Sequence, residues 1–306
     1  MEKGIITIAQ GKQKYIDMAV YLAMSLKLYC PHIKRAVVTD RPKSVLNEYY
    51  DIIIPVNPSY GMGYVQKLKV YEYSPFENTL FIDADCLVVR SVEPIFEHFK
   101  KSEMSVYGNK DTSGKFFDVD FNILSKEFSV KYMIRFNGGI YYFKKSELAQ
   151  KVFAECESII KKYDELNLYK HRGLIADEAV MSIAMSKNCV EPIKLESPEM
   201  QLAGGKKTEL EVLKGKCKFE CYENSVAEPA IYHYGGDAYP FHVKREIFKL
   251  KLFYFKKFNK NLASFLGNLF YNPGYAIYVF VYRIYKSIFK GTKLKFTPVL
   301  PPYKYK

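Results

Sequence analysis

The chain has 306 residues, of which 48% are hydrophobic, and a formal net charge of +13. This length and composition argue against disorder over most of the chain and allow one large α/β domain with a small appendage, or two modest domains. The charge is uneven, because residues 241–306 contain 14 Lys and Arg against one acid and residues 1–240 are neutral. A neutral body with one basic end indicates an anionic surface at that end rather than a protein that binds nucleic acid throughout.

The cysteines and the N-terminus predict a cytoplasmic protein. The six cysteines show no paired framework, and Cys217 and Cys221 have no second pair at zinc spacing, so we interpret all six as free thiols. The first residues enter a strand-like run without the apolar stretch of a secretory signal. No window has the roughly 18 apolar residues that a membrane-spanning helix needs.

The pattern of apolar residues predicts strands alternating with helices. This alternation is typical of an α/β fold with a parallel, doubly wound sheet, in which ligands bind at the carboxyl ends of strands. In chain order, we expect a strand at Ile5–Ala9, a helix at Tyr15–Leu28, strands at Ala36–Thr39 and Ile52–Pro55, a helix at Val65–Tyr71, a strand at Leu80–Ile82, a helix at Glu93–Lys100, strands at Met104–Tyr107 and Gly139–Phe143, helices at Ser146–Tyr163 and Asp177–Ser186, and a strand at Ile231–His233.

The composition changes near Phe241, which predicts a body at residues 1–240 and a helical, basic and aromatic segment at residues 241–306. Asn272-Pro273-Gly274 is expected to interrupt the helix in this segment. Interleaved aromatic and cationic residues favour an anionic membrane surface as the partner of residues 244–306. A helical hairpin packed on the body is the alternative, and nucleic acid is a weaker third interpretation.

The strongest chemical feature is Asp83-Ala84-Asp85 at the end of an apolar strand. Two carboxylates separated by one small residue can both bind a hard divalent cation such as Mn²⁺ or Mg²⁺. Such a cation would neutralise a diphosphate leaving group. Two solvated aspartates in a turn are the alternative for this motif on its own.

Three further segments add candidate groups. His233 offers a third metal ligand, and the backbone of Gly236 can approach phosphate oxygens. Asn137-Gly138 forms a polar turn before a strand and suits hydrogen bonds with a sugar. Asp177 and Glu178 open an apolar helix, where acidic residues also favour the helix dipole.

Together these segments resemble the glycogenin-like and bacterial lipooligosaccharide galactosyltransferase family of retaining glycosyltransferases, family 8, from Ile5 to about Phe241. The resemblance implies the GT-A fold, a Rossmann-like mixed sheet with helices on both faces. It also implies a UDP-sugar donor, an acceptor that is a glycan or a lipid-linked glycan, and Mn²⁺ or Mg²⁺ on Asp83, Asp85 and His233. The donor would contact Ala9, Gln10, Tyr15, Lys67, Asp83, Ala84, Asn137, Gly138 and Gly236, and the catalytic residues would be Asp177 and Glu178.

Two positions depart from the family pattern. Tyr239 stands where the family has a lysine that neutralises the diphosphate, and Lys244 and Arg245 are candidates for that charge. Glu178 replaces a glutamine and adds negative charge near the anomeric carbon. The sequence therefore predicts a metal-dependent glycosyltransferase at the inner face of a membrane. An inverting enzyme on the same fold and a catalytically silent membrane-binding scaffold are the alternatives.

Overall fold

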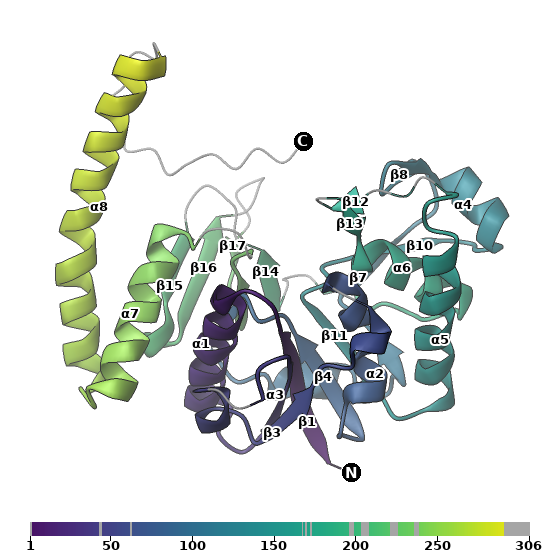
Figure 1. Cartoon of the computed structure of the whole chain (residues 1–306), viewed down its shortest axis with the longest axis horizontal. Coiled ribbons are helices and arrows are strands. Elements are labelled where there is room, and N and C mark those ends of the chain that lie inside the picture. Colours follow the sequence, from purple (N-terminus) through teal and green to yellow (C-terminus); the bar gives the residue numbers. More distant parts are fainter. Residues whose placement is uncertain are drawn as a thin grey trace.

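A six-stranded sheet lies at the centre of the molecule, in the order β3–β2–β1–β4–β11–β6 (Figure 1). The computed structural model describes residues 2–42, 45–61, 63–166, 168, 170–171, 173–195, 199–202, 208–220, 226–235 and 239–290. β1, β2, β3 and β4 run parallel, whereas β11 runs antiparallel to its neighbours β4 and β6. The strands are β1 (Lys3–Ala9), β2 (Lys34–Thr39), β3 (Ile52–Pro55), β4 (Asn78–Ile82), β6 (Met104–Ser105) and β11 (Ile140–Lys144).

The predicted α/β class is therefore confirmed, and the sheet is mixed. The parallel direction expected from the strand–helix alternation was wrong for β11 alone, and the mixed sheet that the family resemblance implies is what the structure has. A short apolar run shows that a strand is buried, but it does not encode the direction in which the strand pairs.

Alternate residues of the central strands pack against helices on the two faces of the sheet. Ile6 and Phe81 lie on one face, in a core shared with α5 (Glu147–Lys161) and α6 (Asp177–Lys187). Ile5 and Leu80 lie on the other, with α1 (Gln13–Tyr29) and α3 (Glu93–His98). Figure 1 shows α1 and α5 on opposite sides of the sheet. Because side chains alternate along a strand, an apolar run can fill both cores.

Smaller sheets and short helices complete the body. β14 (Met200–Leu202), β18 (Ile231–His233) and β5 (Cys86–Val88) form one sheet, and β15 (Thr208–Glu211), β16 (Lys216–Glu220) and β17 (Val226–Ala227) form another. The remaining strand pairs are β7 (Gly108–Asp111) with β10 (Met133–Phe136), β8 (Lys115–Phe116) with β9 (Val119–Asp120), and β12 (Lys170–His171) with β13 (Leu174–Ile175). The other short elements are α2 (Val70–Tyr73), α4 (Phe121–Phe128), and the 3₁₀ helices η1 (Val45–Glu48), η2 (Pro58–Tyr60), η3 (Gly63–Lys69) and η4 (Val212–Lys214).

The helix predicted at Val65–Tyr71 is mostly the 3₁₀ helix η3, followed by the single turn α2. Three successive residues of η3 have different surroundings. Gln66 is fully buried and donates to the carbonyls of Asn57 and Gly61, and Leu68 lies in the core. Lys67, between them, contacts carboxylates of the candidate site.

The C-terminal segment forms the helices α7 (Phe241–Phe255) and α8 (Lys260–Lys290). Helix α7 packs on the body, with Val243 and Leu250 fully buried, and α8 packs on α7 and extends past the body (Figure 1). The boundary at residues 240 and 241 stays a prediction. Among the described residues, no helix is both long and apolar enough to cross a membrane.

The interruption expected at Asn272-Pro273-Gly274 was wrong, because α8 continues through these residues. Proline lacks an N–H donor and its ring crowds the carbonyl four residues earlier, which together cost about 3 kcal/mol in a helix interior, and the remaining turns of a long helix can offset that cost. The chain reverses instead between the two helices. There the backbone of Lys257 has a φ of 53°, and the Asn259 side chain accepts a hydrogen bond from the Leu262 N–H at 2.9 Å.

Candidate functional site

The ends of β4, β11 and β18 bring the predicted metal ligands together. Asp83 follows β4, and its N–H donates to the Gly139 carbonyl just before β11, at 2.9 Å. β18 pairs with β5 so that His233 lies opposite Cys86. As a result, His233 Nε2 lies 3.2 Å from Asp85 Oδ1 and 3.9 Å from Asp83 Oδ2.

Lys67 joins this cluster to the first turn of α6. Its ammonium lies 3.0 Å from Asp83 Oδ2 and 2.6 Å from Asp177 Oδ2, and it also donates to the Gly138 carbonyl at 3.1 Å. The Lys67 side chain is only 12% exposed, so these three oxygens, rather than water, stabilise the charge of its ammonium. The buried Lys67 ammonium therefore lies between the Asp83 and Asp177 carboxylates and pairs with both.

The Asn137-Gly138-Gly139 turn lies directly against the site. The Gly138 N–H donates to Glu178 Oε1 at 2.6 Å, and the Asn137 carboxamide oxygen accepts from the Gly139 N–H at 2.9 Å. A Cβ on Gly138 would lie 2.6 Å from Glu178 Cγ, and one on Gly139 would lie 2.7 Å from His233 Nδ1. Both glycines are required because the two side chains occupy the space of a Cβ.

Burial and mutual charge shift the pKa values in the cluster. Burial, with the Asp85 charge in addition, raises the pKa of Asp83 to about 6 against the opposing effect of Lys67. Burial alone would raise the pKa of Asp85, but the charge and the hydrogen bond of His233 lower it by more, so the pKa of Asp85 lies below its ordinary value. Burial lowers the pKa of His233, yet Asp85 and Asp83 raise it overall. Burial and then the Asp177 charge raise the pKa of Glu178.

The spacing of Asp85 and His233 fits a hard divalent cation, whereas Asp83 Oδ2 lies farther out, 3.9 Å from His233 Nε2. Adjacent ligands of an octahedral ion with bonds of about 2.1 Å lie about 3.0 Å apart, close to the 3.2 Å between Asp85 and His233. His233 Nδ1 lies 3.1 Å from the Asn137 oxygen. A proton on Nδ1 would be donated to that oxygen, which leaves Nε2 to bind a metal.

Cys86 is a potential ligand that the sequence analysis did not identify. Its Sγ and the nearest ligand atoms of Asp85 and His233 all lie within 4.8 Å of one another. Burial raises the pKa of the Cys86 thiol well above its ordinary value, which disfavours the thiolate that binds metals. The signal available in the sequence was its position directly after the Asp-x-Asp motif.

Three of the residues predicted to contact the donor, Ala9, Gln10 and Tyr15, lie at the end of β1 and the start of α1. Ala9 and Ala84 are buried in one apolar cluster, against which Tyr15 and Tyr239 also pack. Gln10 Nε2 donates to the Gly63 carbonyl at 3.1 Å. Gly236, which was predicted to approach phosphate oxygens, lies outside the described residues.

The structure also shows the surroundings of Tyr239 and of Lys244 and Arg245, the two candidates for the charge that neutralises the diphosphate. The Tyr239 hydroxyl donates to the Lys14 carbonyl at 3.4 Å, and the Lys14 ammonium lies 4.8 Å from the centre of the Tyr15 ring. Arg245 is bonded to Glu246 and to the Leu210 carbonyl, whereas Lys244 is exposed on the first turn of α7.

Comparison with known proteins found solved structures with a similar backbone fold but no match by sequence. No family model matches the sequence, and no curated protein matches it. Similar solved structures include galactosyltransferase LgtC in complex with donor and acceptor sugar analogs (14% identity, 86% of this chain and 95% of that chain, TM-score 0.48). Others are the bifunctional glycosyltransferase WbbM (14%, 78% and 47%, 0.49) and mouse xyloside xylosyltransferase 1 (12%, 77% and 98%, 0.45). At these identities and scores, the assignment of function rests on the residues of the site.

Proposed function

We propose that this protein is a metal-dependent glycosyltransferase that transfers a sugar from a UDP-sugar to a glycan or a lipid-linked glycan, with retention of configuration. The observation that carries the proposal is the meeting of Lys67, Asp83, Asp85, Asp177 and His233 in one cluster. These residues come from η3, the turn after β4, α6 and β18, which are far apart in the chain. A buried group of two carboxylates and an imidazole beside a lysine suits a cation and a diphosphate.

Asp83, Asp85 and His233 would hold Mn²⁺ or Mg²⁺. When bound, the ion supplies positive charge to the diphosphate as the bond to the sugar breaks. Lys67 fixes Asp83 on one side and Asp177 on the other through its two ion pairs. Because both carboxylates are held by one buried ammonium, the positions of the metal site and of the sugar-binding carboxylate are linked.

Asp177 and Glu178 act on the transferred sugar. Asp177 binds hydroxyl groups of the donor sugar, and Glu178 lies near the anomeric carbon and stabilises its developing positive charge. The Gly138 N–H holds the Glu178 carboxylate at 2.6 Å, which fixes the orientation of that charge. The acceptor hydroxyl enters from the face that the diphosphate leaves, so the configuration is retained.

The test is hydrolysis of a panel of UDP-sugars with and without Mn²⁺. We expect slow hydrolysis of one or a few donors by the wild type, loss of activity in excess chelator, and recovery with Mn²⁺. Asp85→Ala should abolish the activity, whereas Asp164→Ala, at an exposed aspartate paired with Lys170, should not. Full hydrolysis in excess chelator, or by Asp85→Ala, would contradict the proposal.

The stereochemistry of the product distinguishes retention from inversion. Proton NMR of the first product formed reports the anomeric configuration before mutarotation. An α-linked donor that first releases the α anomer of the free sugar supports retention, and first release of the β anomer would show that the enzyme inverts.

We further propose that the exposed face of α8 contacts an anionic membrane surface. Exposed apolar side chains recur along this helix at spacings of three and four residues, and the segment that contains it carries the excess positive charge. Because α7 packs on the body through Val243 and Leu250, α8 is the helix that offers this face. The residues that are 41–68% exposed are Leu262, Phe265, Leu269, Phe270, Ile277, Phe280, Val281, Tyr282, Tyr285 and Ile288.

Sedimentation with liposomes tests this contact. We expect salt-sensitive binding to vesicles that contain anionic lipid and little binding to neutral ones, since each Lys or Arg near the surface contributes about 1 kcal/mol. The double variant Phe265→Ser/Phe280→Ser should lose binding, and Ile123→Ser, at an equally exposed apolar residue on α4, should retain it. Equal binding by both variants would contradict the proposed surface.

A further inference from the structure

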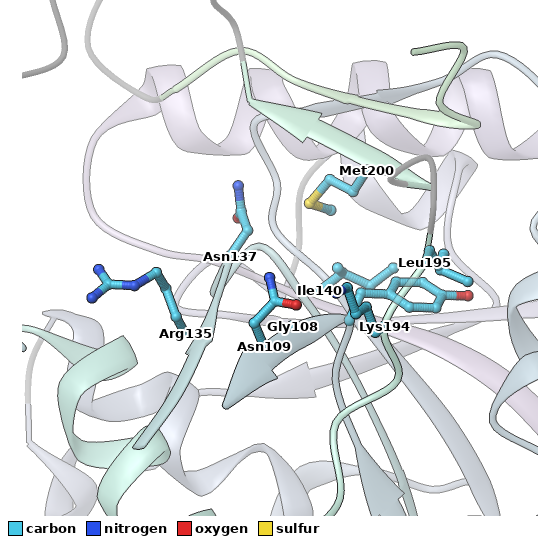
Figure 2. Close-up of a pocket in the computed structure, with 9 residues that line it drawn as sticks. Gly108, Asn109, Arg135, Asn137, Ile140, Lys194, Leu195 and Met200 are labelled. Carbon is cyan, nitrogen blue, oxygen red and sulfur yellow. The ribbon is translucent and has the colours of Figure 1, made fainter. Parts of the chain in front are cut away.

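A cavity of about 220 Å³ adjoins the candidate site (Figure 2). Asn137 belongs to both, because it lines the cavity and its oxygen lies 3.1 Å from His233 Nδ1. The cavity therefore opens beside the place where the donor's sugar would be held. Its lining residues come from β7, β10, β11, β14 and the segments next to them: Tyr107, Gly108, Asn109, Arg135, Asn137, Ile140, Lys194, Leu195 and Met200.

The lining combines an apolar surface with two amides. Ile140 and Met200 are 3% and 6% exposed, so they form fixed apolar walls. Asn109 and Asn137 bring side-chain amides to the same space, as Figure 2 shows. Asn109 is exposed, so its amide is accessible to a ligand. Gly108 is needed in the wall, because a Cβ there would lie 2.5 Å from the Arg135 carbonyl oxygen.

The two cations at the cavity do not make it an anion site. Arg135 Nε donates to Asp111 Oδ2 at 2.6 Å, and in Figure 2 its guanidinium points away from the other lining side chains. Lys194 lines the cavity and is exposed, as Asn109 is, so water can solvate its ammonium. The groups that converge on the space are thus neutral amides and apolar side chains.

We propose that this cavity binds the acceptor, as one uncharged pyranosyl ring at the end of a glycan. This inference rests on the proposed glycosyltransferase function. A cavity of about 150 Å³ holds one benzene ring, so about 220 Å³ suits one six-membered ring with its hydroxyl groups. Amides both donate to and accept from hydroxyl groups, and apolar side chains pack against the C–H face of a sugar.

The position next to Asn137 fits the transfer. An acceptor hydroxyl oxygen forms a bond to the anomeric carbon of the donor sugar. The bond from that carbon to the diphosphate oxygen breaks, and the nucleoside diphosphate leaves with the electron pair and takes up the hydroxyl proton.

The experiment uses the full chain and two readouts. Saturation-transfer NMR measures the binding of neutral methyl pyranosides and of a sugar phosphate, and the donor assay measures the ratio of transfer to hydrolysis. We expect a neutral pyranoside to bind the wild type. Asn109→Leu should weaken that binding and lower the ratio about tenfold, the effect of one lost hydrogen bond. Asn122→Leu, at an exposed asparagine on α4, is the matched control and should match the wild type.

Several results would overturn the inference. These are the absence of saturation transfer to every neutral pyranoside, equal behaviour of Asn109→Leu and Asn122→Leu, and binding of the sugar phosphate tenfold tighter than its neutral counterpart. Failure of the proposed function looks different, because the wild type would then bind a pyranoside through Asn109 but would hydrolyse no UDP-sugar.

Discussion

Replacing His242 should make the protein more resistant to acid. His242 lies in the first turn of α7, and its Nε2 is 2.5 Å from the Tyr232 hydroxyl. Burial, and then the positive charge of Arg245, lower the pKa of His242 from 6.5 to about 4. The unfolded chain therefore takes up a proton between pH 6.5 and pH 4 that the folded protein does not bind, and stability is lost as the pH falls through this range.

The magnitude follows from the two pKa values. Each unit of difference between the pKa of 6.5 in the unfolded chain and about 4 in the folded protein lowers the free energy of unfolding by about 1.4 kcal/mol at a pH where both states are fully protonated. At pH 5 the unfolded chain is almost fully protonated at this site and the folded protein is not, so His242 lowers the free energy of unfolding by about 2 kcal/mol relative to pH 8. His242→Gln should remove this loss, and its amide can still pair with the Tyr232 hydroxyl.

Urea denaturation of both proteins at pH 8 and pH 5, followed by circular dichroism, is the measurement. The change in unfolding free energy between the two pH values should be about 2 kcal/mol smaller for His242→Gln than for the wild type. His32→Gln, at an exposed histidine, is the matched control and should follow the wild type. Identical pH dependence of His242→Gln and wild type would refute the reasoning.

Three further substitutions test the site. Lys67→Met leaves two buried carboxylates without their cation and should lower the free energy of unfolding by about 3–5 kcal/mol, as measured by urea denaturation; a change below about 1 kcal/mol would contradict the buried ion pairs. Gly139→Ala places a Cβ 2.7 Å from the His233 ring and should weaken Mn²⁺ binding at least tenfold in calorimetry, and unchanged affinity would argue against His233 as a ligand. Tyr239→Lys should tighten UDP binding by about 1.5–3 kcal/mol, and no change would mean that another cation already neutralises the diphosphate.

The amino-acid sequence by itself determined the elements with strong periodicity and the identity of the reactive groups. The apolar runs that became β1, β2, β3, β4 and β18 were predicted within a few residues, and so was the start of α5, where Ser146 accepts from the Ala149 N–H. The Asp-x-Asp motif, the Asn-Gly turn and His233 were identified from residue type and position. These features are local, because the period of burial and the chemistry of a side chain are written in neighbouring residues.

Only the tertiary structure decided the direction of β11, the continuity of α8 through Pro273, and the position of Lys67 between two carboxylates. It also placed Cys86 beside His233 and formed the cavity next to Asn137. Each depends on segments that are far apart in the chain. Which strand pairs with which, and which side chains meet, is set by packing of the whole core, and no short stretch of sequence contains that information.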